Sequence, residues 1–181
     1  MIEKAIEMIL IAIGEDTKRE GLIKTPERVA RMYEEVFSSV EKNDFDECKL
    51  FYSENEKDVI TLNNIEFYSM CEHHLLPFFG HVHIAYVPNN KKVCGLSKIV
   101  RMIDYCSKRP SIQENLTYQI AKIFQDNVQP KGIAVAIEAT HLCMAMRGVK
   151  SSGAITKTSH FEGVFNENDD LKRDFLRLFK P

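Results

Sequence analysis

The chain has 181 residues, a formal net charge of −2 at pH 7, and 44% hydrophobic and 28% charged residues, an ordinary composition for a folded domain. The small net charge gives no electrostatic reason to expect nucleic acid as a partner. No apolar run approaches the ~20 residues needed to span a bilayer. The five cysteines are an odd number, which favours a reducing compartment and metal or catalytic use over a disulfide framework. We therefore expect a cytoplasmic protein that binds neither nucleic acid nor membranes.

Residues 1–40 are expected to form two amphipathic helices. Isoleucines recur at helical spacing before Gly14, a residue type that commonly ends helices. Thr25 and Pro26 are typical of an N-cap followed by the first helical residue, and an apolar i, i+3, i+4, i+7, i+8 stripe follows them. The stripe consists of Val29, Met32, Tyr33, Val36 and Phe37. Residues 41–57 are of mixed charge, and we expect a connecting loop there.

The next stretch predicts an antiparallel pair of strands. Residues 59–69 are β-branched and aromatic with partial alternation, interrupted near Asn63 and Asn64. Residues 80–87 alternate in polarity and stop at Pro88, so they form the returning strand of the pair.

Two helices are expected in the middle of the chain. The first opens at Gly95, with Ser97 as its N-cap, and ends before Pro110. The second begins at Ser111 and Glu114, which have the spacing of a capping box. In this interpretation, Glu114 closes the cap of that helix.

The last third of the chain predicts two strands and a helix. Residues 132–146 are the longest strand candidate, residues 154–159 are weakly strand-like, and residues 168–179 form a final amphipathic helix. The order of elements argues for an α+β fold, with helices packed on an antiparallel sheet.

Two short motifs, far apart in the sequence, point to a metal. Cys71 and His74 come from Cys-Glu-His-His, and Cys143 comes from Thr-His-Leu-Cys. Zinc takes cysteine sulfur and histidine nitrogen in tetrahedral geometry, and a catalytic zinc keeps one position open for water. His73 and His141 would then lie beside the metal as proton carriers. If residues 140–147 are a strand, His141 and Cys143 share a face of it, together with Ala145 and Arg147.

Other interpretations of the same residues stay open. A cysteine buried in a core behaves as a small hydrophobic residue, and Cys-x-x-His is less typical of zinc than Cys-x-x-Cys. A structural zinc would need a fourth protein ligand, for which the candidates are His81, His83, Cys94 and Cys106.

Several cationic side chains could bind phosphate. Lys98 and Arg101 lie one turn apart near an expected helix N-terminus, which presents free N–H groups and partial positive charge. Arg28 and Arg31 lie off the apolar stripe of their helix, where a plain solvated face is the simpler interpretation.

Five motifs in the same order make the sequence similar to the GTP cyclohydrolase I family, from about Thr25 almost to the C-terminus. The motifs are Thr25–Ala30, Ser69–His74, Gly95–Ile99, Arg109–Pro110 with Gln113–Glu114, and Thr140–Cys143 through Arg147–Gly148. The resemblance implies the tunnelling fold, with residues 58–181 as the catalytic domain. It also implies that subunit sheets join into a barrel in a toroidal homodecamer with active sites at subunit interfaces.

The same resemblance implies conversion of GTP and water to 7,8-dihydroneopterin triphosphate and formate, the entry step to pterins and tetrahydrofolate. By position, it implies zinc ligation by Cys71, His74 and Cys143, and catalysis by His73 and His141. The implied substrate-binding residues are Gln113 and Glu114 for guanine, and Lys98, Arg101, Arg28 and Arg147 for phosphates, with Ser97 nearby.

Three other functions compete with this one. They are a zinc-stabilised binding module, a tunnelling-fold reductase of deazaguanine nitriles that uses cysteine without zinc, and a GTP-binding regulatory protein without catalysis. The pair His73 and His141 argues against the first and third, and the complete metal triad argues against the second.

Overall fold

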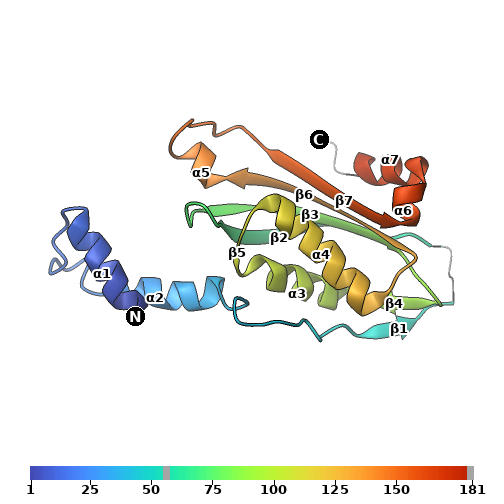
Figure 1. Cartoon of the computed structure of the whole chain (residues 1–181), viewed down its shortest axis with the longest axis horizontal. Helices are drawn as coiled ribbons and strands as arrows, with labels where there is room; N and C mark the ends of the chain where they lie inside the picture. Colours follow the sequence, from blue (N-terminus) through green and yellow to red (C-terminus); the bar gives the residue numbers. More distant parts are fainter. Residues whose placement is uncertain (55–57, 179–181) are drawn as a thin grey trace.

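The computed structural model describes residues 1–54 and 58–178 (Figure 1). Two helices come first, α1 (Ile2–Ala12) and α2 (Thr25–Val36), and they contact each other. Pro26 lies in the first turn of α2, as expected, but the N-cap is Lys24. Thr25 is therefore inside the helix, and the prediction that it caps the helix is wrong.

A five-stranded sheet forms the centre of the molecule, in the order β5-β2-β3-β6-β7. Its strands are β2 (Ile60–Cys71), β3 (Pro77–Val87), β5 (Pro110–Ser111), β6 (Gly132–His141) and β7 (Thr156–Gly163). The pairs β2–β3, β3–β6 and β6–β7 are antiparallel, whereas the short β5 runs parallel to β2. The predicted interruption of the first strand is confirmed, because the β2–β3 register shifts between Leu62 and Ile65.

A second, two-stranded sheet joins β1 (Leu50–Tyr52) to β4 (Lys92–Cys94). The prediction that residues 41–57 are only a loop is therefore wrong. Leu50, Phe51 and Tyr52 are apolar or aromatic, which suits a strand, but their partners lie about 40 positions further along the chain. Charged neighbours obscured this short strand in the sequence.

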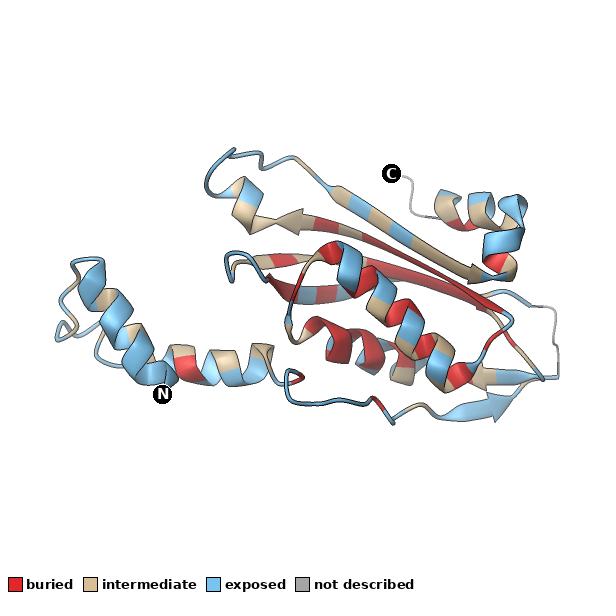
Figure 2. Cartoon of the chain, in the orientation of Figure 1, coloured by how far each residue is buried: buried red, intermediate tan, exposed pale blue. Residues whose placement is uncertain are grey.

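One face of the main sheet is covered by α3 (Leu96–Ser107) and α4 (Gln113–Val128). The core lies between these two helices and the sheet (Figure 2). Tyr86 of β3, for example, packs against Phe124 of α4 with 4.9 Å between ring centroids. Both predicted side-chain caps are wrong, because the N-caps are Gly95 and Ile112 and neither makes a side-chain cap hydrogen bond. The capping role expected for Glu114 is therefore absent.

The opposite face of the sheet is partly covered by two short helices, α6 (Val164–Glu167) and α7 (Asp169–Arg177). Phe165 and Phe175 pack there against small alanines of β3 and β6. The predicted final helix is thus two helices, with Asn168 capping the second through its side chain; the end of the predicted range lies outside the described residues. The α+β class is confirmed. No helix in the described part of the chain is both long and apolar enough to cross a membrane.

Candidate metal centre and substrate site

The first metal motif lies in the turn that joins β2 to β3. Cys71 is the last residue of β2, and its backbone N–H donates to the carbonyl of Leu76 at 2.9 Å. The backbone N–H of Leu75 returns to the Cys71 carbonyl at 2.8 Å, with Leu75 in the left-handed region at φ 51°. This tight turn brings His74 back towards Cys71.

The second motif lies where β6 leaves the sheet. The strand ends at His141, and a short helix, α5 (Leu142–Ala145), follows. The prediction that the strand continues to residue 146 is therefore wrong, and His141 and Cys143 are not on one strand face. Two features explain the change from strand to helix. Leu, Met and Ala are good helix formers. The pairing of β6 with β3 also ends here, at Phe78 and His141, so no strand partner remains. The helical turn carries Cys143 towards the β2–β3 turn.

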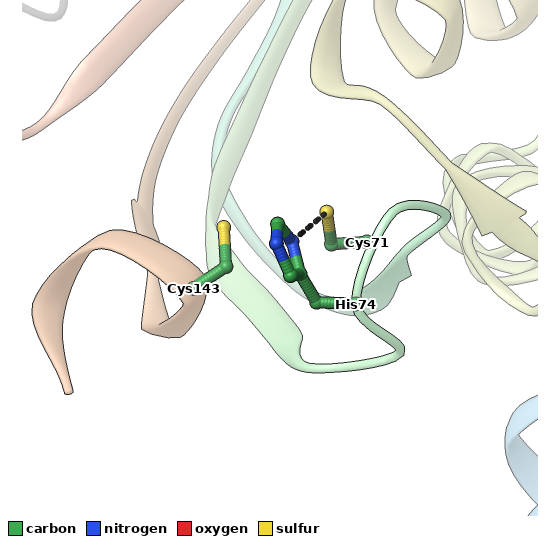
Figure 3. Close-up of side chains that lie close together, drawn as sticks. All are labelled: Cys71, His74 and Cys143. Atoms are coloured by element: carbon green, nitrogen blue, oxygen red, sulfur yellow. Dashed lines mark hydrogen bonds between the residues drawn. The ribbon is translucent and has the colours of Figure 1, made fainter. Parts of the chain in front are cut away.

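Cys71, His74 and Cys143 converge, with their candidate ligand atoms all within 4.8 Å of one another (Figure 3). The Cys71 sulfur lies 4.0 Å from Nδ1 of His74. Zinc–sulfur and zinc–nitrogen bonds of about 2.3 and 2.0 Å give ligand separations slightly shorter than these in a tetrahedral site. The donor set therefore fits zinc after a small contraction.

No fourth protein ligand completes this group within residues 1–54 and 58–178. The candidates considered from the sequence were His81, His83, Cys94 and Cys106, and all four lie outside it. A closed structural site built from these residues is therefore not supported, whereas three ligands and one open position are the pattern of catalytic zinc.

His73 and His141 flank the cysteines in different environments. His73 is exposed, with Nδ1 3.8 Å from the Cys71 sulfur. The ring of His141 stacks on that of Phe78, with 4.9 Å between centroids and planes 4° apart. Burial lowers the pKa of His141, and the negative charge of Glu114 opposes this shift.

Gln113 fixes the orientation of His141. Its side-chain nitrogen donates to the carbonyls of Ile137 and Thr156, both at 3.1 Å, and to Oγ1 of Thr158 at 3.0 Å. Because three acceptors surround the nitrogen, the Gln113 oxygen must face His141, whose Nε2 lies 2.8 Å away. In neutral His141 the proton is then on Nε2, and Nδ1 is the basic atom.

Comparisons with known proteins indicate the family of this chain. The GTP cyclohydrolase I family model matches residues 2–180. GTP cyclohydrolase 1 of Enterococcus faecalis is 56% identical over 175 residues, covering 97% of this chain and 94% of that protein. The enzyme of the same name from Lactiplantibacillus plantarum is 54% identical over 176 residues, covering 97% and 93%. The chain belongs to the GTP cyclohydrolase I family.

The resemblance drawn from the sequence is thus confirmed. Among solved structures, an archaeosine synthase QueF-like protein in the apo form matches with a TM-score of 0.49 and 16% identity, covering 60% of this chain and 97% of that one.

The cations expected to bind phosphate in this GTP cyclohydrolase I family member do not all lie near the metal residues. Arg147 is close, since its Nη1 lies 3.1 Å from Nε2 of His74. Lys98 and Arg101 are on α3, which begins beside β4 at the end of the sheet away from α5 (Figure 1). Ser97 and Arg28 are exposed, the latter on α2. Within this chain, these groups are therefore spread over three regions.

Two positioning residues of this family member, Phe78 and Thr158, were not expected from the sequence. Phe78 supports the ring of His141. Thr158 accepts from Gln113, and its hydroxyl lies 2.6 Å from that of Thr117. Only the sheet register, which pairs Phe78 with His141 and Ile137 with Thr158, brings these side chains to the site. A single sequence gives no direct signal for such pairing.

Proposed function

We propose that this protein uses a zinc ion held by Cys71, His74 and Cys143 to convert GTP and water into 7,8-dihydroneopterin triphosphate and formate, the first step of pterin and tetrahydrofolate synthesis. The observation on which this proposal depends is the convergence of those three side chains within 4.8 Å, with no fourth ligand among the described residues. When bound, zinc would activate water for attack at neutral pH. Residues of the chain would transfer the protons and bind the guanine and the triphosphate.

His141 and His73 are proposed to move the protons of the reaction. Water adds to C8 of guanine, N7 takes a proton as the five-membered ring opens, and a second hydration at the same carbon releases formate. The His141 ring, held by Gln113 and Phe78, presents Nδ1 for this transfer. Burial lowers the pKa of His141, which favours the neutral imidazole, whose Nδ1 can accept a proton.

Glu114 is proposed to recognise guanine. The N1–H and 2-amino groups of guanine are adjacent donors, and a carboxylate accepts from both. Glu114 lies exposed in the first turn of α4, next to Gln113 and within electrostatic reach of His141. Gln113 was expected to share this role, but its polar atoms are already engaged by the protein. Its contribution in our proposal is to position His141.

The triphosphate is proposed to bind Lys98, Arg101, Arg147 and Arg28, with Ser97 nearby. Assembly of several copies, in the decamer that the family resemblance implies, would complete such a site. The observation that favours assembly is the placement of Lys98 near the start of a 12-residue helix, about 18 Å long, which ends close to the metal motif. Lys98 of one copy would then bind the triphosphate of a GTP molecule whose guanine lies at His141 of another copy.

We also propose the division of the chain drawn from its sequence, with an N-terminal helical region in residues 1–40 and a catalytic domain in residues 58–181. A cytoplasmic location is proposed because all five cysteines are free thiols, as a reducing compartment requires.

The direct test is incubation of zinc-loaded protein with GTP, measuring formate and, after oxidation, pterin fluorescence. The Cys143→Ser variant should lose the zinc and both products. Cys106→Ser is the matched control, because Cys106 is a buried cysteine that does not belong to the metal group. This variant should retain the zinc and both products. Undiminished formate production by Cys143→Ser would overturn the proposal.

A further inference from the structure

One motif of the family resemblance, Arg109–Pro110, has no part in the chemistry proposed above, yet it leads into a strand at the metal motif. This strand, β5, pairs in parallel with the end of β2, where Ser111 is the partner of Cys71. The backbone N–H of Glu72 also donates to the Ser111 carbonyl at 3.1 Å. The position of β5 therefore affects the chain at the metal motif.

The same strand leads into the helix that carries the proposed guanine-binding carboxylate. Gln113, the first residue of α4, follows Ser111 by two positions, and Glu114 comes next. A strand of two residues thus joins the candidate metal ligand Cys71 to Glu114. The distance between the bound metal and the bound guanine would depend on where β5 lies.

Hydrogen bonds on two sides of Arg109 anchor this short strand. On one side, the Ser69 hydroxyl of β2 donates to the Arg109 carbonyl at 3.4 Å. On the other, Nη2 of Arg109 donates to the Ser39 carbonyl at 2.7 Å. The backbone N–H of Ser39 in turn donates to the Lys108 carbonyl at 3.2 Å. Because Ser39 is 2% exposed, water has little access to this reciprocal pair of bonds.

An aromatic ring of α3 supports the guanidinium of Arg109. The guanidinium lies over the ring of Tyr105, 4.9 Å from its centroid, in a cation–π arrangement. The Tyr105 hydroxyl donates to the Lys42 carbonyl at 2.9 Å. A guanidinium can stack through its face and donate from its edge at the same time, whereas an ammonium group has no such faces. Arg109 therefore joins β5, α3 and residues 39–42.

We propose that Arg109 is a positioning residue of the site, which fixes β5 against the segment after α2 and thereby holds the metal motif and Glu114 at the separation that the substrate requires. The inference rests on the proposed function for the roles of Cys71 and Glu114. Arg109 takes no direct part in the chemistry and acts through β5.

The test compares full-length, zinc-loaded parent with Arg109→Met, which removes the donors to Ser39 and keeps an apolar stem on Tyr105. Zinc affinity, measured by competition with a chromogenic chelator, should fall by about tenfold, the effect of losing a contact that supports a metal ligand. Deuterium exchange of residues 69–76, followed by mass spectrometry, should be about fivefold faster, as expected when one hydrogen bond no longer opposes local opening.

Three further variants separate positioning from a general loss of stability. Arg109→Lys keeps a charge and one donor group, so its zinc affinity should lie between those of the parent and Arg109→Met. Ser69→Ala loosens β5 from its other side and should weaken zinc binding too, which provides the test if Arg109→Met does not fold. Phe165→Leu alters packing on the opposite face of the sheet. It should lower the melting temperature and leave zinc affinity unchanged.

A lower melting temperature of Arg109→Met, with the parent's zinc affinity and exchange rate, would overturn the inference and leave Arg109 a purely structural role. An equal loss of zinc affinity in Phe165→Leu would overturn it as well. Failure of the proposed function is a different result, since the zinc-loaded parent would then yield no formate from GTP, whatever the variants show.

Discussion

At the scale of single residues, adjacent positions do different things because their surroundings differ. Gln113 is 1% exposed and bonded through both polar atoms of its side chain, while Glu114, the next residue, points to solvent. The first can orient another side chain, and the second can meet a ligand. Substitutions at the two positions should therefore affect different quantities.

Replacing Glu114 by Gln or Ala should raise the KM for GTP by about tenfold or more, because a carboxylate paired with two guanine donors is lost. The melting temperature should change little, since Glu114 is exposed and caps nothing. Steady-state kinetics and thermal unfolding measure both, with exposed Asn115→Ala as the control. A parallel loss of stability and affinity would show that the residue is structural.

Gln113→Ala should act mainly on kcat. The variant removes the hydrogen bond that fixes Nε2 of His141 and leaves the carbonyls of Ile137 and Thr156 short of a donor. We expect a loss of about 2 kcal/mol of unfolding free energy, a lower kcat and a displaced pH profile. A large rise in KM at unchanged kcat would instead assign Gln113 to guanine.

At the scale of elements, β3 buries a histidine among alternating apolar residues. His83 is 1% exposed, and burial lowers its pKa. Glu138 opposes the shift, while His81 and Lys157 reinforce it. The folded protein therefore binds fewer protons at this site than the unfolded chain does.

The sign of the pH effect follows from linkage. Because the folded-state pKa lies below the unfolded value of 6.5, the free energy of unfolding should fall as pH drops below about 6.5. His83→Gln should flatten that part of the curve. Denaturant unfolding between pH 5 and pH 8 measures it, and an identical slope in parent and variant would contradict the assignment.

Sequence periodicity predicted the longer elements because their buried faces are continuous. It missed β1, whose partner β4 is remote, and α5, where helix-forming residues follow a strand without a break. It also placed Ser97 and Glu114 in caps that backbone geometry assigns to Gly95 and Ile112. The metal triad was predictable because its chemistry restricts the residue types, whereas the support given by Phe78 and Thr158 depends on sheet register.

At the scale of the whole molecule, we propose that the site takes residues from more than one copy of the chain. The metal residues and Arg147 lie at one end of the sheet, and Lys98 and Arg101 belong to the helix that begins at the other. One copy of the chain therefore places only part of the proposed phosphate-binding set near its own candidate metal residues. Activity should depend on assembly.

Subunit mixing tests this dependence. His141→Ala and Arg101→Ala should each be inactive alone. Unfolding and refolding them together should restore activity, because some interfaces then combine an intact His141 from one copy with an intact Arg101 from another. If the mixture stays as inactive as its components, both residues serve the same subunit's site and the shared-site proposal is wrong.

The central claim is one zinc with an open position, and X-ray absorption spectroscopy of the zinc-loaded protein tests it most directly. We predict two sulfurs at about 2.3 Å, one nitrogen at about 2.0 Å and one oxygen from water, and no bound zinc in Cys143→Ser. A first shell made only of protein sulfur and nitrogen, with no oxygen, would contradict the account.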